Sequence, residues 1–153
     1  MQAVVVLQHE AISGVITFTR KKGAKTCLIE GEFNGLTPGL HGIHIHEYGD
    51  LREGCASACA HYNPFHKDHG FPGDENRHVG DLGNLKVNQS GHATFRLRDR
   101  VIHPKDIVGR SIVIHADPDD GGKGGFPDSL TTGHAGARLV CAVIGWARPP
   151  KHC

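Results

Sequence analysis

The sequence predicts an all-β protein, an eight-stranded antiparallel Greek-key sandwich or flattened barrel with two long functional loops. Short apolar or alternating runs recur along the chain with turn residues between them, and 21 glycines and 8 prolines supply those turns. No segment keeps a helical period over eleven or more residues. The 153 residues are enough for one buried core, so we expect a single domain over 1–153 with a short tail at 148–153.

The strands follow from local patterns. The run Val15–Thr19 alternates apolar and polar side chains, which is typical of a strand with one buried face. The expected strands are Ala3–Leu7, Gly14–Arg20, Thr26–Phe33, the strand that carries His44 and His46, Leu82–Val87, Ala93–Arg98, Ser111–His115 and Arg138–Trp146.

Two connections are far longer than turns. They span 34 residues at 47–80 and 22 residues at 116–137. Loops beyond about 12–15 residues are usually functional or disordered. The first holds several potential metal ligands and the second is rich in glycine, so we predict that a metal cluster orders both.

Composition and termini exclude several classes of function. The net charge is +1 and no basic run occurs, so we expect no nucleic-acid partner. Met1–His9 has no basic region and an apolar run of only five residues, which fits a first strand better than a secretory signal. No segment approaches the ~20 apolar residues of a membrane span. These observations predict a cytoplasmic protein without membrane contact.

Five cysteines do not make a disulfide framework, because the count is odd and cytosolic thiols are usually reduced. We expect unpaired thiols at Cys27, Cys59 and Cys153.

His44 and His46 form the most informative pair in the chain. Residues two apart in a strand point to the same face, so two imidazoles project side by side while Ile43 and Ile45 point into a core. The other candidate ligands are His61, His69, His78, Asp81 and His115. A set rich in imidazole, with one carboxylate and no thiolate, favours copper or zinc.

The size of the set predicts two metals. Six histidines and one aspartate exceed the four ligands of one tetrahedral zinc. Two four-coordinate metals need eight ligands, and an imidazolate that bridges them would supply the missing one. We expect His41 to pack beneath the site at best. The remaining histidines are expected to be ordinary surface or hydrogen-bonded residues: His9, His66, His92, His103, His134 and His152.

A series of motifs resembles the cytosolic type of the copper–zinc superoxide dismutase family. They run in order over nearly the whole chain: Gly42–Asp50, Gly54-Cys55, His61–Pro64, Asp68–Gly70, Arg77–Asn84, Gly133–Leu139 and Gly145–Ala147. The resemblance implies an antioxidant enzyme that dismutates superoxide to oxygen and hydrogen peroxide. Its cofactors would be a redox-cycling copper and a structural zinc joined through a histidine.

The resemblance also implies a role for each matching residue. Copper would be held by His44, His46, His61 and His115, and zinc by His61, His69, His78 and Asp81. His61 would bridge the metals, and Asp119 would link His44 with His69. Arg138 would attract the anion with its permanent charge. Cys55 and Cys141 would form a disulfide.

Two kinds of protein partner are implied as well. Cytosolic members of the family are commonly homodimers, and a copper chaperone would load the metal. The residues that fall at the family's symmetric interface are Tyr48, Gly49, Val108, Gly109 and Trp146.

The chain departs from the family in both loops. Cys59-Ala60 stands where the family usually has glycine and proline, and this cysteine could mispair with Cys141. The segment 126–132 has one acid and no lysine, where many relatives place two acids and a lysine. Asp117 occupies a position that is commonly basic. The resemblance therefore implies weaker steering of superoxide, resting more on Arg138 and Lys123.

Two other functions stay open at this point. A copper-delivery protein of the same fold would add a thiol-rich domain or a Cys-x-Cys tail and often lose a copper ligand, whereas all four candidates are present here. A metal-buffering or structural sandwich would bind zinc alone, and a copper-loaded activity assay would distinguish it from the enzyme.

Overall fold

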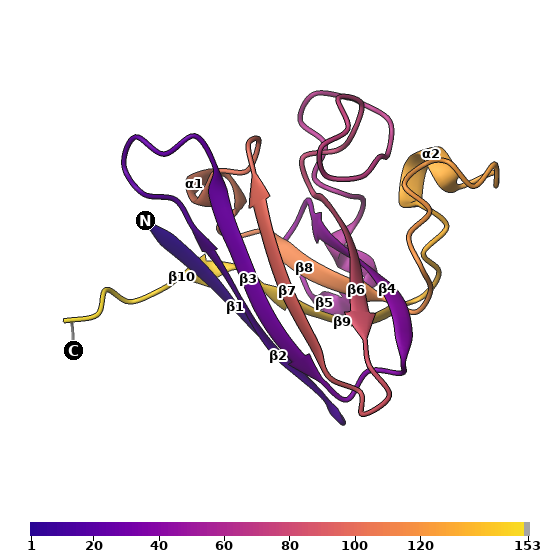
Figure 1. Ribbon diagram of the computed structural model, residues 1–153, viewed down its shortest axis with the longest axis horizontal. Coiled ribbons are helices and arrows are strands. Elements are labelled where there is room, and N and C mark those ends of the chain that lie inside the picture. Colours follow the sequence, from indigo (N-terminus) through magenta and orange to yellow (C-terminus); the bar gives the residue numbers. More distant parts are fainter. Residues whose placement is uncertain (152–153) are drawn as a thin grey trace.

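Two antiparallel sheets face each other across one core in the computed structural model, which describes residues 1–151 (Figure 1). The order in the five-stranded sheet is β10-β1-β2-β3-β7, and in the four-stranded sheet β6-β4-β8-β9. The first sheet consists of β1 (Gln2–His9), β2 (Ile12–Thr19), β3 (Cys27–Asn34), β7 (Ala93–Asp99) and β10 (Gly145–Trp146). The second consists of β4 (Gly39–His46), β6 (Asp81–Val87), β8 (Ser111–His115) and β9 (Arg138–Val143). The predicted all-β sandwich is confirmed.

Alternation along the strands builds the core. In β1 the side chains of Ala3, Val5 and Leu7 are buried and their neighbours are more exposed. Ile43 and Ile45 of β4 are fully buried on the core side, as their spacing predicts. From His41 onward, however, every residue of β4 is buried, including those on the opposite face. The long loops cover that outer face, so β4 lies between the core and the loops.

Residues 1–151 form ten strands, where the sequence predicts eight. The run expected at Arg138–Trp146 divides into β9 and β10 because Ile144 leaves the ladder: its N–H donates to Arg110 O and its carbonyl accepts from Gly109 N. A short strand, β5 (Arg52–Cys55), lies in the first long loop. One-turn helices occur at η1 (Ala56–Ala58), α1 (Pro104–Ile107) and α2 (Ser129–Thr132), each too short to give a detectable helical period.

Both long loops leave the sandwich on the side away from the chain termini (Figure 1). A disulfide joins Cys55 of the first loop to Cys141 of β9, with the two Cα atoms 5.8 Å apart. The buried Arg77 secures the other end of this loop. Its guanidinium lies 2.5 Å from Asp99 Oδ2 and donates to the backbone oxygens of Val79 and Asp81. The loop is therefore fixed at both ends before any metal is considered.

The remaining cysteines agree with the sequence prediction as far as the description reaches. Cys27 is buried and Cys59 is exposed, and both are unpaired. Cys153, like His152, lies outside the described residues.

Within the described residues, no helix has the length and apolar character that a membrane crossing requires.

Loss of the Cys55–Cys141 bond is expected to lower the free energy of unfolding by about 2–4 kcal/mol, because the bond closes a long loop of 86 residues in the unfolded chain. Urea unfolding of Cys141→Ser against the parent protein measures the change. Cys59→Ser is the matched control, since that thiol is unpaired. Equal unfolding midpoints for the parent and Cys141→Ser would contradict the prediction.

Candidate metal centre

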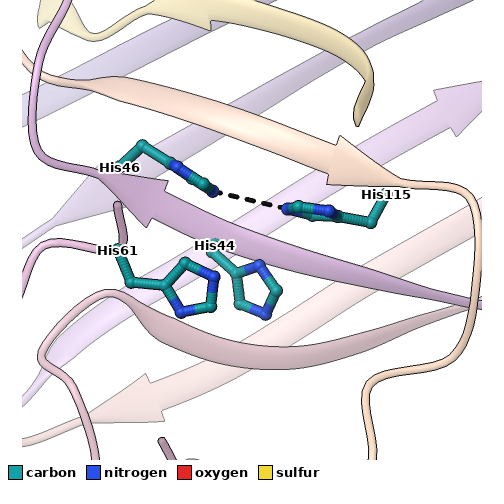
Figure 2. A group of neighbouring side chains, drawn as sticks. All are labelled: His44, His46, His61 and His115. Carbon is teal, nitrogen blue, oxygen red and sulfur yellow. Dashed lines mark hydrogen bonds between the residues drawn. The ribbon is translucent and has the colours of Figure 1, made fainter. Parts of the chain in front are cut away.

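Buried ligand atoms converge in two groups that share residues. One consists of His44, His46, His61 and His115, and the other of His44, His61, His69 and Asp81. Within each group the ligand atoms lie within 4.8 Å of one another. Figure 2 shows the four rings of the first group turned toward one another. The two groups contain six of the seven predicted ligands, and the seventh, His78, lies beside the second group, as described below.

Strand pairing positions the first group. β4 carries His44 and His46 on its outer face, and β8, which pairs with β4, ends at His115. His61 reaches the same place from the first long loop, through an isolated antiparallel bridge between His46 and His61. The two sheet-borne elements are rigid, so three of the four imidazoles are held by the sandwich itself.

Each histidine of this group that comes from the sheet has one nitrogen occupied. His46 Nδ1 lies 2.7 Å from Cys59 O, and His115 Nδ1 lies 3.1 Å from Gly136 O. His44 Nε2 lies 2.5 Å from Asp119 Oδ2. An oxygen acceptor holds the N–H on its own side of the ring, so the opposite nitrogen carries the lone pair.

The free nitrogens face one another. His46 Nε2 and His115 Nε2 are 3.4 Å apart, the contact drawn in Figure 2. His44 Nδ1 and His61 Nε2 are buried without any hydrogen-bond partner. A buried polar atom without a partner is costly. Four convergent imidazole lone pairs are the donor set that copper prefers, so the residues present fit this metal.

The second group surrounds Asp81. Its Oδ1 lies 3.0 Å from His61 Nδ1, 2.9 Å from His69 Nδ1 and 3.2 Å from His78 Nδ1. The Nδ1 atoms of His61 and His78 are 3.1 Å apart. A tetrahedral zinc with ligand bonds of about 2.0 Å needs ligand atoms roughly 3.3 Å from one another, so these distances fit zinc.

Both His78 and His44 are candidates for the fourth ligand position of the second group, beside His61, His69 and Asp81. His44, and not His78, belongs to the group defined by the 4.8 Å limit. We favour His78, because its Nδ1 is in direct contact with two of the other ligand atoms. The remaining free nitrogen of His44 is needed by the first group.

Asp119 links the two groups. Its Oδ2 contacts His44 Nε2, and its Oδ1 lies 2.7 Å from His69 Nε2. Asn84 holds the backbone of Asp119 with two hydrogen bonds, one from its own Nδ2 to Asp119 O and one from Asp119 N to its Oδ1. Gly133 packs against this pair: a Cβ there would lie 2.4 Å from both Asp119 Oδ1 and His69 Nε2.

Burial and hydrogen bonds set the charges before metal binds. Burial lowers the pKa of His46 to about 2, with neighbouring His61 adding to the effect, so its ring is neutral. Burial alone would raise the pKa of Asp81, but hydrogen bonds from His61, His69 and His78 hold it far below its usual range. Burial likewise opposes the protonated form of His69, yet hydrogen bonds to Asp119 and Asp81 raise its pKa to about 9. Before metal binds, His46 of the first group is therefore neutral, while the second group pairs an ionised Asp81 with a protonated His69.

Arg138 begins β9 beside the first group, opposite His115 in the pairing of β8 with β9. Its Nη1 donates to Cys55 O at 2.7 Å, and the guanidinium is partly buried. Its charge is among the causes that lower the pKa of both His46 and His115, after burial as the largest. The positive field of Arg138 therefore reaches the first group.

Sequence analysis anticipates one further residue that supports the site and misses two others. His41 packs beneath the site, as expected, with Nδ1 2.7 Å from His115 O. The carbonyl of Cys59 and the amide of Asn84 were not anticipated in their roles. Lys123 was expected to help attract the substrate, but its Nζ lies 3.5 Å from Asp74 Oδ2 on the first loop, so part of its charge is neutralised.

Comparisons with known proteins agree with this geometry. The sequence profile of a family described as copper/zinc superoxide dismutase matches residues 12–144. A protein of Onchocerca volvulus named superoxide dismutase [Cu-Zn] is 49% identical over 148 residues, which cover 93% of this chain and 94% of that protein. A crystal structure whose title names the clock protein EA4 superposes with a TM-score of 0.88 at 46% identity, over 94% of this chain and 93% of that one.

Asp81→Ala is expected to weaken zinc binding by at least about tenfold, because it removes the carboxylate at which three histidines meet. Competitive titration with a chelator measures the zinc affinity. Asp68→Ala, an exposed acid of the same loop, should bind zinc as the parent does. Unchanged affinity in Asp81→Ala would remove this residue from the zinc set.

Proposed function

The chain belongs to the copper/zinc superoxide dismutase family, and from this premise we propose how its residues divide the work. The protein is an enzyme that converts superoxide to oxygen and hydrogen peroxide, with copper and zinc as cofactors. The observation that carries the assignment of residues is the position of His61. Its Nδ1 lies among the atoms around Asp81, while its Nε2 is unpartnered on the side of the copper histidines.

We propose two ligand sets with one shared member. Copper would be bound by His44, His46, His61 and His115, and zinc by His61, His69, His78 and Asp81. His61 would then be the residue that both ligand sets share. Asp119 fixes the ring orientation of His44 and His69 and so holds the two sets in register.

The overall reaction takes two superoxide anions and two protons to one oxygen and one hydrogen peroxide. Copper supplies one-electron redox chemistry when bound, and zinc is redox-inert. The protons that the reaction consumes must be delivered by groups of the protein. His61 can hold a proton on Nε2 while Nδ1 stays with the zinc set, so this ring can deliver a proton to the reduced oxygen species.

Arg138 is proposed to attract and orient the anion. A guanidinium carries a permanent charge and offers forked donors, which suits a small anion. Its Nη1 is fixed by Cys55 O, and the disulfide fixes Cys55 in turn. The position of the charge thus depends on the covalent link between the first loop and β9.

The two other functions considered from the sequence have less support. All four proposed copper ligands are present and converge, which does not favour a delivery protein that has lost one. Zinc alone would leave His44 Nδ1 without a partner, although it is fully buried.

A homodimer is proposed through the face that carries Tyr48, Gly49, Val108, Gly109 and Trp146. Tyr48 and Trp146 are each about half exposed, and Val143 is nearly so. Gly49 lies so close to Gly109 that a Cβ would stand 2.2 Å from its carbonyl oxygen, so the two backbone segments are in close contact. A partly apolar patch suits a symmetric contact.

Cellular context is also part of the proposal. We place the enzyme in the cytoplasm, because Cys27 and Cys59 are unpaired and free thiols are typical of reducing compartments. The copper ligands are buried, so entry of the ion requires the loops to open, and a copper chaperone is the partner proposed to achieve this. Residues 1–153 are proposed to act as one domain.

His46→Ala tests the function and the copper set together. We expect copper content to fall and catalysed superoxide decay to drop at least about a hundredfold, while zinc content stays at the parental level because the zinc set is intact. Metal analysis and pulse radiolysis give the two readouts. His103→Ala is the control histidine outside the site. Full activity and copper content in His46→Ala would overturn the copper assignment.

Arg138→Ile is expected to lower the second-order rate constant by at least about tenfold without loss of copper, because one decade is only ~1.4 kcal/mol of anion stabilisation. The fall of the rate with added salt should also become shallower, since salt screens attraction between charges. Arg138→Lys should keep part of the salt dependence but lose the forked donors. If Arg138→Ile retains the parental rate and salt slope, the guiding charge lies elsewhere.

A further inference from the structure

His134 is hydrogen-bonded, as the sequence analysis expects, and it makes a second contact in addition. Its ring stacks on Phe126 with ring centres 3.7 Å apart and an angle of 8° between planes. Its Nδ1 lies 2.7 Å from Asp128 Oδ1. His134 also adopts a positive φ of 53°, unusual for a residue with a side chain. Three side chains of the second long loop thus form one cluster, which we call the loop clasp: Phe126, Asp128 and His134.

The clasp adjoins a helical turn, α2, that lines a cavity beside His61. Asp128 directly precedes α2, a single turn about 6 Å long. Leu130 and Thr131 of α2 line a cavity of about 590 Å³ together with His61 and His78. Leu130 O also accepts a hydrogen bond from His69 N. The clasp residues do not line this cavity, but Asp128 is the residue before the turn whose Leu130 and Thr131 do, so its charge lies within one helical turn of the cavity wall.

Asp128 places a negative charge close to this wall, where it opposes the approach of an anionic substrate. It is the only acid of the segment 126–132, which contains no lysine. The nearest acid and base along the loop are already engaged: Asp120 Oδ2 accepts from Ser129 Oγ at 2.6 Å, and Lys123 pairs with Asp74. Among the described residues, Asp128 provides the one carboxylate within 4.0 Å of the His134 ring nitrogens.

We propose that the loop clasp is a proton-operated charge switch for the established reaction. When His134 is protonated, it neutralises Asp128 and removes the repulsion that this carboxylate exerts on superoxide. When His134 is neutral, the clasp keeps its geometry but carries one negative charge. His134 is thus a residue that tunes substrate attraction, and the proposal rests on superoxide being the substrate.

The switch needs no conformational change. Nδ1 donates to Asp128 in both states, so the proton is gained and lost at Nε2 on the other edge of the ring. Histidine is the side chain whose charge commonly changes between about pH 5 and 8. Stacking on Phe126 favours the cationic ring through the π-face of the phenyl group. The hydrogen bond from His134 also holds the pKa of Asp128 below its usual range, so the acid is ionised throughout.

The clasp itself is tested on the copper(I)–zinc holoprotein, which is diamagnetic. We expect the NMR titration midpoint of the His134 ring protons to be lower in Asp128→Asn than in the parent, because an ionised partner that favours the protonated ring is lost. His92, which contacts Asn34 and Glu32 on the sandwich, should keep its midpoint in that variant. An unmoved midpoint for His134 would show that the clasp does not form in solution.

The effect on substrate is tested by pulse radiolysis of fully metallated parent and His134→Asn at low ionic strength. Asparagine tolerates the positive φ and still donates to Asp128, but it does not titrate. We expect the ratio of the parental rate constant to that of the variant to rise from about one at pH 8.5 to about two at pH 5.5, and to return to one in high salt. His92→Asn, the matched control, should give a ratio of one throughout.

The possible outcomes distinguish failure of the charge switch from failure of the enzymatic function. A flat ratio in an active parent enzyme, or the same pH-dependent ratio for His92→Asn, would overturn the charge switch alone. Absence of catalysed superoxide decay in the metallated parent would overturn the enzymatic function on which the switch rests.

Discussion

The contact of Asp119 with two histidines is the interaction on which the rest of the site depends. One carboxylate oxygen holds His44 of the sheet and the other holds His69 of the first long loop, while its own backbone belongs to the second loop. Three parts of the chain therefore meet at one buried acid. Asn84 of β6 secures that acid through its backbone. Buried polar networks stabilise a structure only when each member is satisfied, which explains why so many side chains converge here.

The position of β4 connects fold to chemistry. A strand normally shows one face to the core and one to solvent, but β4 is buried on both. Its core face anchors Ile43 and Ile45, and its other face presents His44 and His46 to the loops. The proposed copper ligands from the sheet are thus backed directly by the core. The loops are held against this face by polar contacts, such as those of Asp119 with His44 and of the Cys59 carbonyl with His46.

Periodicity predicted the parts of the structure that depend on side-chain type. Alternation located most strands and the shared face of His44 and His46. It could not reveal contacts made by the backbone, such as the carbonyl of Cys59 that orients His46, because every residue has a carbonyl. The assignment of ligands to two metals came from the family motifs, since spacing alone does not say which nitrogen of His61 faces which group. The loop clasp was missed because His134 meets its partners only after α2 turns the chain.

Cys59 shows how the site accommodates its departures from the family. It adopts φ 62° and ψ −141°, a conformation that suits glycine, and such strain costs on the order of 1–3 kcal/mol. The carbonyl oxygen of Cys59 accepts the hydrogen bond from His46 Nδ1, and Cys59 also interacts electrostatically with Arg138. Strain of this kind persists only where the surroundings fix the backbone, and here the disulfide at Cys55 and the bridge between His46 and His61 do so on either side. The chain can therefore carry a side chain at this position without releasing the copper ligand, because the acceptor belongs to the backbone.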